Sequence, residues 1–89
     1  MASYKIVLKP SVEKDLRFLP RSLVKRALAE VEALQDDPLP RQASKLQGGE
    51  NLYRIRVGDY RIIYGVDHSM KQILVHYIRH RREAYRKKH

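Results

Sequence analysis

The chain has 89 residues and a formal net charge of +9, from 19 lysines and arginines against 10 aspartates and glutamates. This length fits one small domain, and we expect a single domain over residues 1–89. The absence of cysteine excludes a disulfide scaffold and a cysteine-ligated zinc or iron–sulfur centre. No apolar run is long enough to cross a membrane, and the N-terminus lacks the apolar segment of a signal peptide, so we expect a cytoplasmic protein without membrane contact.

The positive charge is concentrated in the second half of the chain. Residues 1–44 carry eight basic and six acidic side chains, a balance of +2, whereas residues 45–89 carry eleven and four, a balance of +7. A strongly basic small domain indicates a polyanionic partner. We therefore expect the functional surface in residues 45–89.

The first half predicts one strand followed by two helices. The hydrophobic periodicity gives, in order, a strand over residues 4–8, helices over residues 11–19 and 22–34, and a turn-rich loop over residues 36–44. Ser11 and Ser22 are the expected N-caps of the two helices. The two helices are expected to form an antiparallel hairpin with a structural role.

The second half changes to the alternating pattern of strands. It predicts strands over residues 52–57, 60–66 and 72–79, with Gly58-Asp59 as a two-residue hairpin turn and a basic tail over residues 81–89. The order of elements predicts an α+β fold: an N-terminal strand, a helical hairpin, and three further strands in one antiparallel sheet with the helices packed on one face.

The two-residue turn fixes which side chains share a face of the sheet. It sets Arg56 opposite Arg61, and alternation puts Arg54 on the same face as both. Like charges directly opposite each other destabilise a sheet, so a sequence selected only for folding would avoid this pair.

The second hairpin is expected to add a fourth arginine. If Val66 pairs with Gln72, Tyr77 lies opposite Arg61, and Arg79 falls on the same face one step beyond. Four converging guanidinium groups repel one another unless they bind an anion, and an RNA or DNA phosphate accepts bidentate hydrogen bonds from them. The alternative is a strand face whose arginines extend into water.

Other kinds of chemistry have little support. The chain has no glycine-rich phosphate loop, and its four histidines lack the spacing of metal ligands, so we expect no metal and no cofactor. No serine or cysteine nucleophile is indicated. Phosphate chemistry on RNA fits a cationic cluster, because RNA supplies its own nucleophile, the 2′-hydroxyl.

Residues 53–64 and 79–85 resemble the RelE/ParE superfamily, the toxins of type II toxin–antitoxin pairs, and the resemblance covers almost the whole chain. The RelE branch is similar to ribosome-dependent endoribonucleases that cleave messenger RNA and inhibit translation. The resemblance implies the RelE-like microbial ribonuclease fold and a catalytic set made of Arg54, Arg56, Arg61, Arg79 and Tyr85. Further RNA contacts are expected from Lys45, Tyr77, Arg81, Arg82 and Arg86.

The general base stays open at this point. Family members often have lysine where this chain has Arg54 and Arg56, and an arginine side chain, with a pKa above about 12, holds its proton too tightly to act as a base. These two arginines are expected to bind phosphate instead. His80 and Glu50 are the candidate proton acceptors, of which the histidine titrates in a suitable range.

The resemblance also implies partners and an alternative activity. A cognate antitoxin, acidic and partly disordered when alone, would wrap the basic domain in a hetero-oligomer, and the ribosome and messenger RNA would be the targets. The ParE branch is similar in fold but inhibits DNA gyrase. A toxin homologue that binds RNA without cleaving it is the remaining alternative.

Overall fold

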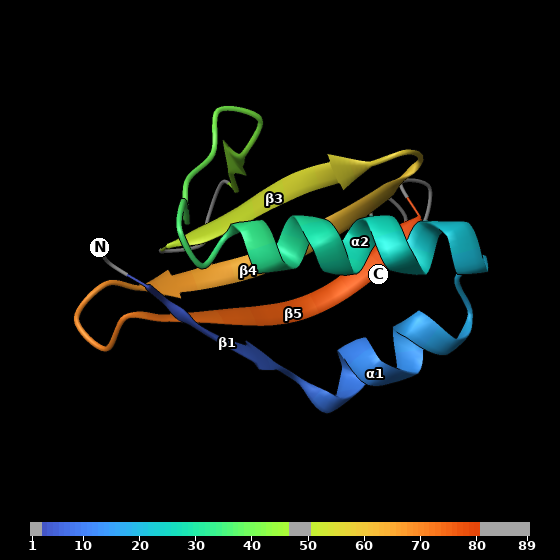
Figure 1. The fold of residues 1–89 in the computed structure, drawn as a ribbon, viewed down its shortest axis with the longest axis horizontal. Helices are drawn as coiled ribbons and strands as arrows, with labels where there is room; N and C mark the ends of the chain where they lie inside the picture. Colours follow the sequence, from blue (N-terminus) through green and yellow to red (C-terminus); the bar gives the residue numbers. More distant parts are fainter. Residues whose placement is uncertain (1–2, 47–50, 81–89) are drawn as a thin grey trace.

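The computed structural model describes residues 3–46 and 51–80 and shows two helices and one sheet of five strands (Figure 1). In chain order the elements are β1 (Lys5–Leu8), α1 (Pro10–Arg17), α2 (Arg21–Ala33), β2 (Ser44–Lys45), β3 (Leu52–Val57), β4 (Tyr60–Asp67) and β5 (Gln72–His80). The predicted α+β class and the three antiparallel strands of the second half are confirmed. Neither of these helices is long and apolar enough to cross a membrane.

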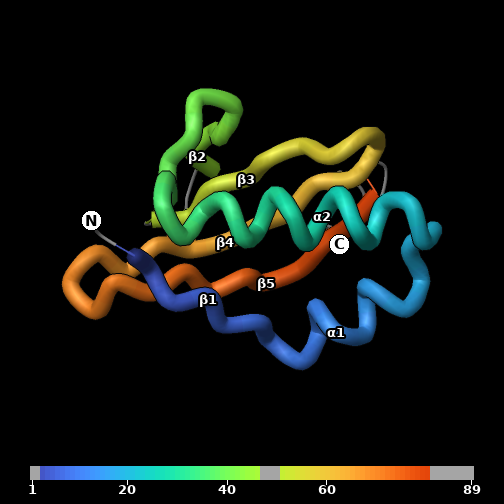
Figure 2. Tube along the Cα trace, viewed as in Figure 1, coloured from blue at the N-terminus to red at the C-terminus, as the bar shows by residue number. Residues whose placement is uncertain are grey.

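The N-terminal strand differs from the expectation of a wholly antiparallel sheet. The strand order is β1-β5-β4-β3-β2, and β1 runs parallel to β5, with Lys5 opposite Gln72 and Leu8 opposite Val75. The two strands lie side by side at one edge of the sheet although they come from opposite ends of the chain (Figure 2). No hairpin turn connects them, so the local sequence does not set their relative direction.

The opposite edge holds a strand that the sequence did not predict. Residues Ser44–Lys45 form β2 and pair with β3, at a place where we expected the end of a loop. A strand of two residues is too short to show an alternating pattern.

Helix α1 begins at Pro10, with Lys9 as its N-cap residue, so the prediction that Ser11 caps this helix is wrong. The Ser11 hydroxyl instead donates a hydrogen bond to the His76 carbonyl oxygen at 2.8 Å. One turn later, the Asp15 carboxylate accepts a hydrogen bond from the backbone N–H of Ile78 at 3.0 Å. Because β1 pairs with β5 only as far as Val75, these two side chains satisfy backbone groups at the uncovered edge of β5.

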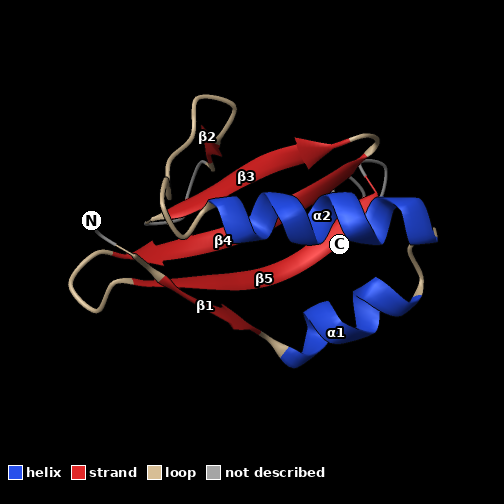
Figure 3. Ribbon diagram, viewed as in Figure 1, coloured by secondary structure: helices blue, strands red, loops and turns tan. Residues whose placement is uncertain are grey.

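Helix α2 begins at Arg21 after Pro20, so the predicted Ser22 cap is also wrong. The two helices run in opposite directions and are joined by a short turn, as expected for a helical hairpin (Figure 3). Helix α2 lies across one face of the sheet, which we call the helix face; the opposite side is called the far face below.

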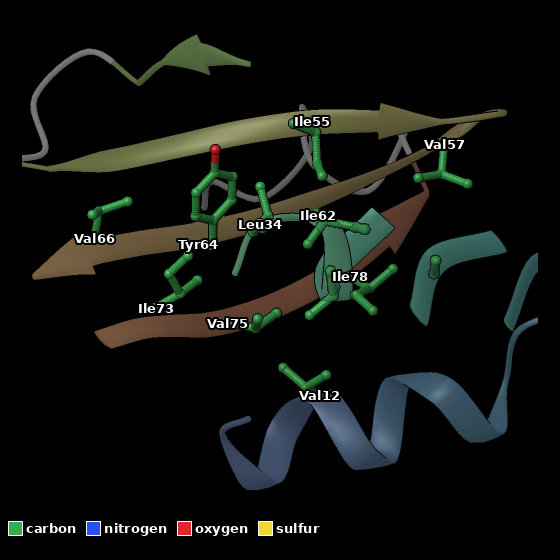
Figure 4. Close-up of a cluster of buried hydrophobic side chains, with 12 residues drawn as sticks. Val12, Leu34, Ile55, Val57, Ile62, Tyr64, Val66, Ile73, Val75 and Ile78 are labelled. Atoms are coloured by element: carbon green, nitrogen blue, oxygen red, sulfur yellow. The ribbon is translucent and has the colours of Figure 1, made fainter. Parts of the chain in front are cut away.

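The hydrophobic core lies between the helices and the helix face (Figure 4). Val12 of α1 packs there against alternate residues of the three long strands, together with Ala27 and Val31 of α2 and the C-cap residue Leu34. The buried members of this cluster are Val12, Ala27, Val31, Leu34, Ile55, Val57, Ile62, Tyr64, Val66, Ile73, Val75 and Ile78. One side of each long strand is therefore packed in the core, and the side chains between these residues project to the far face.

Tyr64 joins this core to the chain segment that leads into β2. Its ring is fully buried, and its hydroxyl donates a hydrogen bond of 2.8 Å to the carbonyl oxygen of Pro38. Burial is the main cause that raises the pKa of Tyr64, and Tyr53 and Asp37 raise it further. The phenol therefore stays protonated and acts as the donor.

Replacing Tyr64 with phenylalanine is expected to lower the free energy of unfolding by about 1 kcal/mol, because the Pro38 carbonyl loses its hydrogen bond while the ring packing is kept. Urea denaturation of the two proteins measures the difference. An unchanged midpoint would show that this hydrogen bond does not hold the segment before β2.

Candidate functional site

The first two arginines of the site are placed by the hairpin of β3 and β4. Gly58, with a φ of 61°, takes the left-handed conformation that a tight two-residue turn requires, and Val57 then lies opposite Tyr60. Arg56 is directly opposite Arg61, as the sequence predicted. Their neighbours Ile55 and Ile62 are buried in the core, so both arginines project to the far face.

Arg79, the fourth arginine, is placed by a register of β4 and β5 that differs from the predicted one. Asp67 rather than Val66 pairs with Gln72, and the register shifts between Ile63 and Tyr64. Ile63 lies opposite Tyr77 while Tyr64 lies opposite Val75, so His76 is an extra residue in β5 and forms a bulge.

The bulge changes which side chains of β5 face the core. Ile73 and Val75 are buried in it on one side of the bulge and Ile78 on the other, an odd spacing that strict alternation does not allow. Tyr77 and Arg79 consequently project to the far face. Arg79 lies directly opposite Arg61, so one row crosses three adjacent strands: Arg56, Arg61 and Arg79.

A second row lies beside the first. Arg54 is opposite Ile63 on β4 and opposite Ser44 on β2, and Tyr77 continues this row on β5. The structure therefore brings four of the predicted catalytic residues and Tyr77 onto one surface. We call Arg54, Arg56, Arg61 and Arg79 the arginine cluster.

Three of these arginines line a cavity of about 260 Å³ together with Gln42 and Ser44. Neither Gln42 nor Ser44 was predicted from the sequence as a site residue. The Gln42 amide donates a hydrogen bond of 3.3 Å to the Glu30 carboxylate on α2. Arginine, amide and hydroxyl groups are all hydrogen-bond donors, so the cavity suits an anion with several acceptor oxygens.

Arg61 and Arg79 differ in their surroundings. Arg61 is only 5% exposed, the one buried charged residue in the described part of the chain. The Arg79 side chain is 38% exposed; its guanidinium carbon lies 4.7 Å from the centre of the Tyr77 ring, and its Nε lies 3.7 Å from the Asp15 carboxylate. Helix α1 and Tyr77 thus hold Arg79 from two sides.

Two predicted site residues lie away from the cluster. Lys45 is opposite Tyr53, whose ring packs against the core, so the register assigns Lys45 to the helix face and its neighbour Ser44 to the far face. His80 is opposite Tyr60, and the two rings meet edge to face at 5.2 Å between centroids. This placement separates His80 from the arginines and argues against it as their general base.

The remaining predicted residues lie outside the described residues. They are Glu50, Arg81, Arg82, Tyr85 and Arg86. Within the described ranges, no group of three or more histidine, aspartate or glutamate side chains could hold a metal ion.

His76 gives a prediction for stability. Burial, reinforced by the positive charge of Lys9, lowers the pKa of its imidazole from the usual 6.5. Below about pH 6.5 the unfolded chain binds more protons at His76 than the folded chain does. The contribution of His76 to stability is therefore present above about pH 6.5 and is lost as the pH falls.

We therefore expect the urea midpoint of the wild type to fall between about pH 8 and about pH 5, and to fall less in His76→Gln, which cannot take up this proton. Urea denaturation of both proteins across this range is the measurement. Equal losses in the two proteins would assign the pH dependence to other groups.

Comparison with known proteins places the chain in a family. A family model described as the ParE toxin of the type II toxin-antitoxin system, parDE, matches residues 6–85. Toxin RelE3 of Methanocaldococcus jannaschii is 32% identical over 85 residues, which is 91% of this chain and 94% of the relative.

Solved structures agree with this assignment. The RelE–RelB complex from Pyrococcus horikoshii matches with a TM-score of 0.80 and 34% identity, over 89% of this chain and 96% of that chain. The RelB–RelE complex from Methanococcus jannaschii matches with a TM-score of 0.79 and 28% identity, over 93% and 99%. The chain belongs to the RelE/ParE superfamily and is a toxin of a type II toxin–antitoxin pair.

Proposed function

We propose that this toxin is a ribosome-dependent endoribonuclease that cleaves messenger RNA and so inhibits translation. The observation that carries the proposal is the row Arg56, Arg61 and Arg79, three guanidinium groups side by side on adjacent strands. Such a row is unfavourable for folding and favourable for binding a phosphate. Similarity to proteins named RelE supports the assignment to RNA.

The proposed reaction uses the 2′-hydroxyl of the RNA. Its oxygen bonds to the adjacent phosphorus while the bond from phosphorus to the 5′-oxygen breaks, leaving a 2′,3′-cyclic phosphate and a 5′-hydroxyl. The arginine cluster neutralises the charge that develops on the phosphate oxygens. Ser44 and Gln42 are placed to bind the same group, because they line the same cavity.

The five residues that line the cavity offer arginine, amide and hydroxyl groups, none of which is a good base near neutral pH. The step needs one group that accepts the 2′-hydroxyl proton and another that protonates the departing 5′-oxygen. Glu50 stays a predicted acceptor, and Tyr85 a predicted stacking platform for a base.

The test is primer-extension mapping of a reporter messenger RNA in a translating extract. The wild type is expected to produce cuts within translated codons, Arg61→Ala to produce none, and Arg21→Ala, which removes an exposed charge from the start of α2, to cut normally. The same reporter incubated without ribosomes should stay intact. An intact message with all three proteins in the translating extract would overturn the proposal and favour gyrase inhibition, the activity of the ParE branch.

We further propose that a cognate antitoxin neutralises this toxin. The similar archaeal RelE chains were solved in complex with RelB. A net charge of +9 favours an acidic, partly disordered partner that wraps the domain.

A further inference from the structure

The far face carries a second concave surface beyond the two arginine rows. Along β4, Gly65 is four residues from Arg61, a distance of about 13 Å in an extended strand. Leu52 and Leu74 lie opposite Gly65 on the two neighbouring strands. Together with His76 and the polar residues at the ends of these strands, they line a groove of about 660 Å³, which we call the Gly65 groove.

Gly65 forms the floor of this groove because it has no side chain. A Cβ atom at this position would lie 3.3 Å from the His76 Nε2 atom and 3.4 Å from a methyl group of Leu52. Both neighbours therefore lean over the glycine from different strands. The backbone at Gly65 has no left-handed φ that would require glycine, so the missing side chain matters because it lets His76 and Leu52 approach the backbone this closely.

The lining of the groove is apolar in the middle and polar at the rim. Leu52 and Leu74 form the walls, and Asn51 and Gln72 bring amide groups that both donate and accept hydrogen bonds. The His76 imidazole stays neutral near pH 7, because burial and Lys9 lower its pKa. An apolar groove with amides and an imidazole at its edge suits a planar heterocycle that has both apolar faces and polar edges.

The groove itself does not suit a phosphate. Its lining residues include no lysine or arginine, and its one carboxylate, Asp67, already accepts hydrogen bonds from the Ser69 hydroxyl and the Met70 backbone N–H. An acidic peptide would likewise find no countercharge there. The cations of this face are concentrated in the arginine cluster, on the same surface and at the other end of the strands.

We propose that the Gly65 groove binds an unpaired nucleobase of the same RNA strand whose backbone lies on the arginine cluster. The assignment rests on the proposed function, since it is the arginine cluster that would bring RNA to this face. The cluster would hold the backbone without regard to sequence, and the groove would select among bases through Asn51, Gln72 and His76. This divides backbone binding and base recognition between two ends of one sheet.

The first test measures the fluorescence anisotropy of a labelled hexaribonucleotide with 2′-O-methyl groups, which cannot be cleaved. Gly65→Val fills the floor and is expected to weaken binding about tenfold, the effect of losing one stacked base. Met70→Ala, an exposed residue of the same hairpin that does not line the groove, should bind as the wild type does. An abasic chain of equal length should bind equally to the wild type and to Gly65→Val. Equal affinity of both variants for the base-bearing chain would overturn the proposal.

The second test needs no substitution. NMR titration of the wild type with the same hexaribonucleotide should shift the His76 imidazole and Leu74 methyl signals together with the arginine Nε–H signals, and the abasic chain should shift only the arginines. Arginine shifts alone with the base-bearing chain would overturn the groove assignment and leave the ribonuclease proposal standing. Groove shifts without arginine shifts would support the groove as a base site and contradict the role of the arginine cluster.

Discussion

Replacing Arg61 with alanine is expected to lower the rate of RNA cleavage by about 10²- to 10³-fold, the usual loss when one preorganised donor to a developing negative charge is removed. Arg61 is the central member of its row and is only 5% exposed. Its guanidinium is therefore held in place before RNA arrives. Single-turnover cleavage of a messenger RNA in ribosomal complexes, with toxin in excess, measures the effect on the chemical step.

The same substitution is expected to leave the fold intact. Arg61 has a like charge directly opposite it on each side, Arg56 on β3 and Arg79 on β5, and alanine relieves both repulsions. Thermal unfolding followed by circular dichroism checks this. A variant that no longer folds would contradict the assignment of Arg61 to ligand binding, because its contribution would then be structural.

Arg61→Lys separates charge from geometry at this position. Lysine keeps the positive charge but offers a single ammonium group instead of a planar fork that can bind two oxygens of one phosphate. We expect a cleavage rate between those of the wild type and the alanine variant. A rate equal to that of the wild type would show that Arg61 acts only through its charge.

The first hairpin shows what local sequence can establish. Gly58-Asp59 between two alternating segments predicts a two-residue turn, and that turn alone sets Arg56 opposite Arg61. The pairing and the shared face of Arg54 were predicted and are confirmed by the register. The order of the helices and the three long strands was predicted for the same reason, since each follows from periodicity within one segment.

The second hairpin shows where such an argument fails. The turn of residues 68–71 is longer, with Lys71 at a positive φ, and nothing in the sequence marks His76 as a bulge. Only the requirement that Ile73, Val75 and Ile78 all reach the core explains why an extra residue enters there. The predicted register was wrong, yet Arg79 still reached the predicted face.

Tertiary contacts explain the other differences. Ser11 has the side chain of a helix cap, but the open edge of β5 offers it the His76 carbonyl instead. Ser44 lies in the two-residue strand β2 and lines the cavity because it pairs with Arg54. Lys45, the predicted RNA contact, is the next residue of β2 and therefore lies on the other face. Neither placement can be read from residues near it in the sequence.

Arg54 and Lys45 lie on opposite faces of the sheet, and this difference leads to a prediction about the salt dependence of RNA binding. Each phosphate contact on a single strand steepens the dependence of log K on log salt concentration by about 0.7. Replacing both Arg54 and Arg56 with alanine is therefore expected to reduce the slope by about 1.4 and to weaken binding most at low salt. Anisotropy titrations of the 2′-O-methyl RNA over a range of salt concentrations measure it.

Lys45→Ala is the matched control for this experiment. It removes one exposed charge from β2, the strand next to β3. Lys45 directly follows Ser44, which lines the cavity, but it lies on the helix face of the sheet. Its salt slope should equal that of the wild type if RNA follows the far face. A slope reduced by Lys45→Ala and unchanged by the double variant would place the RNA on the helix face, and the arginine cluster would then need another ligand.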